Sequence, residues 1–270
     1  MAAVLELPPL QQRKVAAIVG ACVADAAAQP LHWIYNEGKM ASLIEGKEEI
    51  EFRHPSANPF YRIPTGSNSC YGDQAYVMLK SLVESKGLDI DHLTKATYDF
   101  FGPNSSYESD ETNKYLVGKE DKINIKKSLP IHGPWRHGCI KDFLANMYAD
   151  KNPTGSETDD QIDCAIRVIP LVAMYAGQPD LLDKAEAALR VLQESDTSIA
   201  CGLAAVRVLE QYILTGKPED VLQKVTDTLN DPDRNCPQDL DRAVIGQLRA
   251  VVRALGTSHE VAVPKYFQKN

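Results

Sequence analysis

Four acidic residues lie close together in the middle of the chain: Glu157, Asp159, Asp160 and Asp163. On a helix, Asp159 or Asp160 would share a face with Asp163, and paired carboxylates of this kind can hold a hard cation. Acidic residues also gather where a helix begins, because the helix dipole favours negative charge there. We favour this second interpretation, in which the cluster has a structural role.

A second group of reactive side chains lies in residues 130–138. This segment places His132, Trp135, Arg136 and His137 among glycines. Two imidazoles, an indole and a guanidinium are suited to a loop that stacks on a ligand or clamps it, although plain connecting loops also have this composition. Gly138 precedes an apolar run and would let the backbone approach a bound group closely, so it is a candidate substrate-binding residue.

Composition and motifs exclude several classes of function. The sequence contains no nucleophile elbow, P-loop, dinucleotide-binding fingerprint or zinc-binding HExxH. Its 29 Lys and Arg against 37 Asp and Glu give a net charge of −8, and a protein that follows phosphates needs the opposite sign, so we expect no nucleic-acid partner. The longest uncharged apolar run, 15–24, is far shorter than the roughly 20 residues that a bilayer requires, so we expect no membrane partner.

The six cysteines are scattered, without a CxxC pair or a metal-like spacing. Several lie in apolar, helix-like surroundings, where a free thiol behaves as a small hydrophobic group. Because disulfides persist mainly in oxidising compartments, we expect free and mostly buried thiols and a cytoplasmic location.

The elements that must position these residues are predicted to be helical. Pro30 ends the first helix and Gly87 ends the second. Ser156 and Asp159 form a plausible capping box ahead of a third. The expected helices cover 10–29, 73–86, a run that follows Ser156, 180–193, 197–214, 219–229 and 238–255.

Apolar stripes on these helices predict a bundle. The run after Ser156 would bury Ile162, Ile166, Ile169 and Ala173, and the last helix would bury Leu240, Val244, Leu248, Val251 and Leu255. Residues 54–69, 103–106 and 130–138 are typical of loops, and only 260–267 could be extended. We therefore predict an all-α, multi-helix bundle that forms a single domain over residues 1–270.

Three segments resemble motifs of the ADP-ribosylglycohydrolase family, in the family's order. Residues 20–30 (GACVADAAAQP) are similar to its opening Gly-x-x-x-Gly-Asp-Ala-x-Gly-x-Pro helix, and 70–79 (CYGDQAYVML) take the place of its Thr-Asp-Asp-Thr metal motif. Residues 164–171 (CAIRVIPL) resemble its Gly-Ala-x-Met-Arg-x-x-Pro helix. The resemblance implies the orthogonal all-α bundle of that superfamily and an ADP-ribose-like small molecule as partner.

Within that family, the chain resembles a divergent branch that includes the J-type lens crystallins of jellyfish and selenoprotein J of fishes. Residues 29–35 and 66–74 carry this likeness. The family places Asp163 and Arg167 on its Met-Arg helix, which makes both residues candidates for substrate binding. For Arg167 the alternative is a structural ion pair inside the bundle.

The resemblance also implies which parts of the family's chemistry are missing. Active members hold two Mg²⁺ ions between the early motif and a late Asp-x-Asp-Thr motif, and Mg²⁺ demands near-octahedral oxygen ligands. Here Asp73 is the one acid left of the early pair, His32 replaces the acid seven residues after Asp25, and no late motif precedes Asn270. We therefore expect Asp73 to be a vestigial metal ligand, with Mg²⁺ bound only if the ancestral site survives.

These observations favour a hydrolase-fold protein that has lost dinuclear-Mg²⁺ hydrolysis and has a crystallin-like structural role or a binding role. One alternative is a metal-dependent hydrolase of ADP-ribosyl or related N-glycosidic bonds, which would use Asp73 with one of Asp159, Asp160 and Asp163. A second alternative is a thiol or selenol redox protein. Because family members continue for several helices, we expect a C-terminally truncated chain with open apolar faces on 180–255. No catalytic residue and no oligomeric state is predicted.

Overall fold

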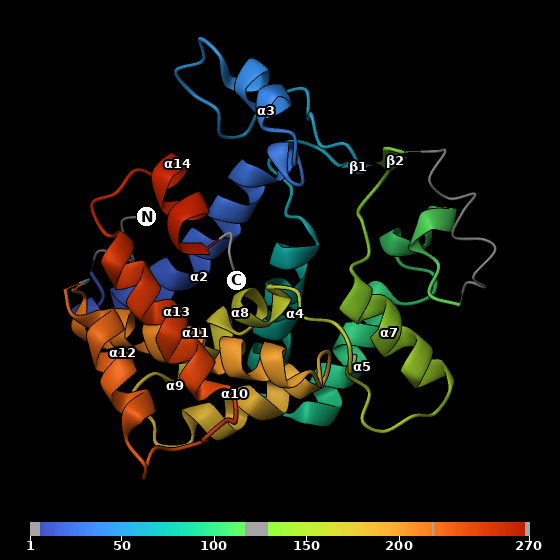
Figure 1. Ribbon diagram of the computed structural model, residues 1–270. Helices are drawn as coiled ribbons and strands as arrows, with labels where there is room; N and C mark the ends of the chain where they lie inside the picture. The colour runs from blue at the N-terminus through green and yellow to red at the C-terminus, as the bar shows by residue number, and fades with distance from the viewer. Residues whose placement is uncertain (1–5, 117–128, 218, 268–270) are drawn as a thin grey trace.

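The computed structural model describes residues 6–116, 129–217 and 219–267, with the side chain of residue 111 left aside. Helices dominate it, as predicted (Figure 1). The first half contains α2 (Pro9–Ala28), η1 (Gln29–Leu31), α3 (Glu37–Ile44), β1 (Tyr61–Arg62), α4 (Cys70–Glu84), α5 (Ile90–Phe101), η2 (Ser106–Glu108) and η3 (Glu111–Asn113). The second half contains β2 (Ile131–His132), α7 (Gly138–Tyr148), α8 (Asp163–Arg167), α9 (Ile169–Tyr175), α10 (Leu181–Arg190), α11 (Asp196–Thr215), α12 (Val221–Asn230), α13 (Asp241–Ala254), α14 (His259–Ala262) and the π-helical turn η5 (Val263–Phe267).

Helix α2 starts at Pro9, where a missing backbone N–H costs nothing, and gives way to η1 at Pro30 as expected. It packs against α4, α9 and α11. Two stretches, Pro9–Leu31 and α11, have the length and mean hydropathy of a membrane-crossing helix, although the run of uncharged residues in α2 is shorter. Half of α11 is buried within the bundle, which is how the apolar core helix of a globular protein behaves.

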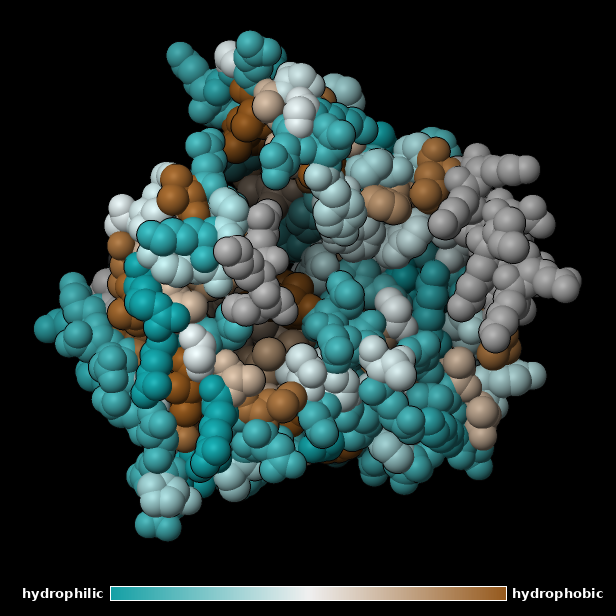
Figure 2. Space-filling model, in the orientation of Figure 1, coloured by the Kyte–Doolittle hydropathy of each residue, from teal (hydrophilic) through white to brown (hydrophobic). Residues whose placement is uncertain are grey.

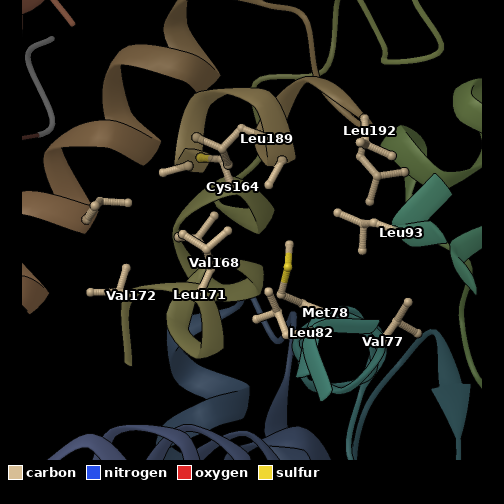
Figure 3. Packing of buried hydrophobic residues seen from close by; sticks show 14 of the residues in the cluster. Val77, Met78, Leu82, Leu93, Cys164, Val168, Leu171, Val172, Leu189 and Leu192 are labelled. Atoms are coloured by element: carbon tan, nitrogen blue, oxygen red, sulfur yellow. The ribbon is translucent and has the colours of Figure 1, made fainter. Parts of the chain in front are cut away.

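The main core lies where α4 and α5 meet α8, α9, α10 and α11 (Figure 3). Ser69 caps α4 by accepting the Tyr71 N–H, so the helix starts three residues before the predicted 73. Figure 3 labels side chains on or beside α4, α5, α8, α9 and α10 that converge on one apolar interior: Val77, Met78, Leu82, Leu93, Cys164, Val168, Leu171, Val172, Leu189 and Leu192. This core fixes the first turn of α4, where the resemblance placed the metal motif.

The prediction of a helix directly after Ser156 is wrong. The Ser156 hydroxyl does accept the Asp159 N–H, at 3.2 Å, but Ser156 also forms a β-bridge with Gln193, and α8 begins only at Asp163. Pro170 then separates α8 from α9, because its nitrogen cannot donate to the preceding turn.

The buried face of α8 and α9 also differs from the predicted isoleucine stripe. Ile162 is 57% exposed, and Ile166 and Ile169 are only half-buried. Cys164, Val168, Leu171 and Val172 fill the core instead, with Ala173 as the one member of the predicted stripe that is buried. The interrupted helix rotates the stripe away from the interior.

The C-terminal helices α10, α11, α12 and α13 confirm the predicted succession. A second apolar cluster joins the last three: Ala200, Ala204, Val221, Val225, Leu229, Val244 and Ile245. The predicted stripe of α13 is buried only at its start, since Val251 is 37% and Leu255 69% exposed. Figure 2 shows apolar side chains at the surface near α13. Residues 260–267 are helical rather than extended, which corrects the strand prediction.

Candidate functional site

Asp163, at the first residue of α8, is the centre of a buried polar network. Its Oδ1 accepts a hydrogen bond from Gln74 Nε2 at 2.5 Å and lies 2.6 Å from Nδ1 of His137. Arg167 donates to Gln74 Oε1 at 3.3 Å and to the Leu189 carbonyl at 3.0 Å. Burial alone would raise the pKa of Asp163, but His137, Gln74 and Arg167 outweigh it and hold the pKa at about 2.

Asp163 and Arg167 are therefore placed beneath the surface, at 1% and 2% exposure, and line neither of the two open cavities described below. They join α4, α8 and the start of α7, whose N-cap is His137. Arg167 donates to a side-chain amide and a backbone carbonyl inside the bundle, so its contacts are structural, but among the described residues it forms no ion pair of the kind expected.

The first turn of α4 is closed by Asp25 of α2. The Asp25 carboxylate accepts hydrogen bonds from the Ser69 backbone N–H at 2.7 Å, the Ser69 hydroxyl at 2.6 Å and Asn68 Nδ2 at 3.1 Å. Asn68 also donates to the Cys22 carbonyl at 2.9 Å, which ties the loop before α4 to α2. Asp25, which lies in the first of the three family-like segments, thus holds the N-cap residue of the neighbouring helix in place.

Gly72 stands in the early motif where the family has an aspartate, and a side chain at this position would have to displace Asn68 and Asp25. A Cβ added to Gly72 would lie 2.4 Å from Asn68 Nδ2, 2.4 Å from Asp25 Oδ2 and 2.8 Å from the Asn68 Cβ. All three distances are shorter than atoms in proteins tolerate. Asn68 and Asp25 occupy the space of the missing acid.

Asp73, the acid that remains, is also engaged by the protein. The Tyr107 hydroxyl, which is fully buried, donates to Asp73 Oδ2 at 2.6 Å. Burial raises the pKa of Asp73 to about 6, with Tyr107 lowering it and the nearby Asp25 raising it. Asp73 lines an open cavity of about 470 Å³ together with Asn68, Tyr76 and other residues between α2 and α4.

These residues do not fit a magnesium pair. The Asp25 carboxylate accepts three hydrogen bonds, and glycine replaces the acid at position 72. The Asp73 carboxylate accepts the Tyr107 hydroxyl, and its raised pKa means that it holds a proton more readily than usual. Within the described residues, no group of three or more His, Cys, Asp or Glu side chains could hold a metal ion. His32 turns to Tyr61, with its Nδ1 3.1 Å from the hydroxyl, and burial lowers the pKa of His32.

A second open cavity, of about 280 Å³, is walled by aromatic side chains. Its lining consists of Trp33, Tyr35, Phe60, Tyr71, Trp135, His137, Gly138, Asp159 and Gln161. Three loops supply most of these residues, and the parallel pairing of β1 with β2 holds two of them in register through Tyr61 and Ile131. The Asn58 side chain fixes one loop by accepting the backbone N–H groups of Phe60 and Tyr61.

Some residues of the loop 130–138 line the aromatic cavity, and another is buried and holds the loop in place. Trp135, His137 and Gly138 line the cavity, as expected of a ligand-contacting loop. Arg136 is fully buried and points into the protein, where it pairs with Glu108 at 2.7 Å and donates to the Phe101 carbonyl at 2.5 Å. His132 is exposed outside this wall.

The four clustered acids are dispersed to different partners. Asp159 accepts from Gln193 Nε2 at 2.7 Å, Asp160 accepts from the Ser195 hydroxyl, and Glu157 pairs with Lys151 at 3.0 Å. Only Asp163 lies in the first turn of a helix. Both the paired-carboxylate hypothesis and the helix-dipole interpretation of the whole cluster are therefore wrong.

Comparison with known proteins gives this arrangement a context. The sequence model of the ADP-ribosylglycohydrolase family matches residues 6–267. Crystallin J1A and crystallin J1B of Tripedalia cystophora are each 35% identical to the chain, over 82% and 80% of its length. The alignments cover 64% and 63% of those crystallins, so the chain spans less than two thirds of their length.

A solved structure supports the same fold. The ADP-ribosylglycohydrolase-related protein complex has a chain that superimposes with a TM-score of 0.53, covering 92% of this chain and 77% of its own length, at 16% identity. At that identity the likeness concerns the fold alone.

Proposed function

Since this chain belongs to the ADP-ribosylglycohydrolase family, we propose that it is a member in which dinuclear-Mg²⁺ hydrolysis has been lost and a crystallin-like structural role has taken its place. The observation that carries the proposal is the filled space at Gly72. Two protein side chains, Asn68 and Asp25, occupy the volume that a metal-binding acid would need, and Asp25 also binds Ser69, the N-cap residue of α4.

The Asp25 side chain that lies against Gly72 also stabilises the start of α4. Asp25 satisfies the buried N–H of Ser69, the N-cap residue of α4, and a hydrogen bond to a charged group contributes about 1.5–3 kcal/mol. These three donors occupy lone pairs on both Asp25 oxygens, which leaves fewer of them for a metal ion.

The redox alternative gains no support from the thiols. All six cysteines are free, and three of them, Cys70, Cys139 and Cys164, are buried. Burial raises the pKa of every one of the six, whereas a redox-active thiol needs a lowered pKa to be present as thiolate. The expectation of mostly buried thiols holds for half of them only, since Cys201 is exposed.

A structural role and a cytoplasmic location belong to the same proposal. Free thiols fit a reducing compartment. A net charge of −8 favours solubility at high concentration, which a crystallin-like protein requires. No Mg²⁺ is needed for this role, and the buried network of Asp163 and Arg167 serves to hold the helices together.

A hydrolysis assay tests the proposal. Release of ADP-ribose from ADP-ribosyl-arginine and ADP-ribosyl-serine peptides is measured with excess Mg²⁺, with a catalytically active family member as positive control. We expect no release above the buffer rate, while the same preparation stays clear and folded when concentrated. Mg²⁺-dependent turnover that a chelator abolishes would contradict the loss of hydrolysis.

A further inference from the structure

The aromatic cavity has the geometry of a box, which the proposed structural role does not require. Trp33 meets Phe60 at 77° and Trp135 at 81°, and Phe60 meets Trp135 at 74°. The three pairs of ring centroids lie 5.5, 6.0 and 5.7 Å apart. Tyr71 adds a fourth ring, at 78° to Trp33. The rings thus pack edge to face against one another and form an aromatic corner at the wall of the cavity, which suits a compact group better than a long flat one.

A carboxylate stands at the wall of the same cavity. Asp159 Oδ1 accepts hydrogen bonds from Gln193 and from the Gln161 backbone N–H. Its other oxygen, Oδ2, receives no hydrogen bond from the residues that the structure describes. A Cβ at position 138 would lie 2.8 Å from that oxygen, so the absence of a side chain at Gly138 is what lets Asp159 lie against the start of α7.

Positive charge is missing from the lining. Neither the 280 Å³ cavity nor the 470 Å³ cavity has Lys or Arg among its described lining residues. Lys141 lies 5.4 Å from the Trp135 ring centroid, but it donates to the Thr112 carbonyl and does not line the cavity. A proton on His137 would be balanced by Asp163, 2.6 Å away. The pyrophosphate of an ADP-ribose-like ligand would therefore find no cationic partner in the lining.

We infer that the aromatic box, defined as Trp33, Phe60, Tyr71 and Trp135, binds a compact organic cation of the quaternary ammonium class, with Asp159 as the counter-charge. The electron-rich faces of aromatic rings attract such cations, and this attraction grows when the site is screened from water. A hydrogen-bonding pocket is not needed, because a quaternary ammonium group has no N–H to donate. The surrounding loops, pinned through Asn58 and Arg136, hold the rings in place before the ligand arrives.

The protein carries its own probe of this site. It has two tryptophans, Trp33 and Trp135, and both belong to the box, so intrinsic tryptophan fluorescence reports on the box alone. Choline chloride is titrated into the protein, with sodium chloride at equal ionic strength as the blank. The uncharged 3,3-dimethylbutan-1-ol, which has the shape of choline without its charge, is titrated in parallel. We expect a saturable change with choline and an affinity for the alcohol at least about tenfold weaker.

Variants separate the box from a general effect. Phe60→Leu keeps both tryptophans and should weaken choline about fivefold to tenfold, and Asp159→Asn should weaken it by a similar factor. Tyr76→Leu is the matched control: this aromatic residue lines the other cavity and should leave the affinity unchanged. Circular dichroism confirms that each variant is folded.

Three results would overturn the inference: no saturable change with choline, equal affinities for choline and the alcohol, or saturation by ADP-ribose in place of choline. The hydrolysis assay is independent of these titrations. If choline does not bind, the proposed loss of hydrolysis is unaffected; if the protein hydrolyses ADP-ribosyl peptides, the proposed cation site is unaffected. The titrations on unmodified protein decide the question even if a variant does not fold.

Discussion

Restoring a side chain at Gly72 is the most direct way to test whether the metal-binding space is filled. A Cβ there would lie 2.4 Å from both Asn68 Nδ2 and Asp25 Oδ2, and these atoms are held by hydrogen bonds to Cys22 and Ser69. Asn68 and Asp25 would have to shift, and overpacking of this kind costs about 1–3 kcal/mol, whereas alanine in a helix gains up to about 1 kcal/mol over glycine. We therefore expect Gly72→Ala to lower the free energy of unfolding by about 1–2 kcal/mol.

The aspartate that the family has at this position should cost more. Gly72→Asp adds a carboxylate beside Asp25 and Asp73 in a buried site, and like charges repel there. We expect a loss of about 4 kcal/mol, from the overpacking together with one weakened charged hydrogen bond. For a domain of this size, each kcal/mol lowers Tm by about 2–4 °C.

Urea unfolding, followed by circular dichroism, measures both variants. Gly246→Ala is the matched control, because nothing lies within 4 Å of a Cβ at this position in α13, and alanine there should stabilise by up to about 1 kcal/mol. Adding Asn68→Ala to Gly72→Ala should recover part of the loss, since it vacates one side of the clash. If Gly72→Ala behaves like the control, the space is not filled and the reasoning fails.

Three further results are expected. Asp73→Asn should increase the free energy of unfolding by at most about 3 kcal/mol at pH 7, because the raised pKa of Asp73 means that its ionised form destabilises the folded protein. This gain should shrink as the pH falls from 6 to 4, which urea unfolding at several pH values tests. Asp163→Asn should cost about 3–5 kcal/mol at pH 7, and its charge contribution should be lost between about pH 4 and pH 2; an unchanged unfolding midpoint would refute it. Thiol titration should find Cys201 reactive in the native state and the three buried thiols reactive only after denaturation; rapid reaction of all six would contradict the burial.

The helices could be predicted because their signals are local. Proline at 30 and the apolar repeats of α10 to α13 act within a few residues, so periodicity alone recovers them. The failure at Ser156 has a physical reason. Its hydroxyl makes the hydrogen bond of a capping box, but it does so within a turn that a bridge to Gln193 holds in place. Pairing with a distant residue outweighs the local preference there.

The site was harder to predict than the fold. Trp135, His137 and Gly138 were found because they are neighbours in one loop, whereas Trp33, Phe60 and Tyr71 come from separate segments with no shared period. Among the described residues, the short pairing of β1 with β2, the packing of α4 and the contact of His32 with the Tyr61 hydroxyl bring them together. Asp163 and Arg167 were selected by resemblance, and resemblance of sequence does not reveal whether a side chain faces a cavity or the core.

Isothermal titration with Mg²⁺ tests the central claim most directly. We predict no binding tighter than millimolar at pH 7, because Asp25 is held by three donors, glycine replaces the acid at position 72, and Asp73 accepts the Tyr107 hydroxyl. Two Mg²⁺ ions bound with micromolar affinity, and lost on Asp73→Asn, would contradict it.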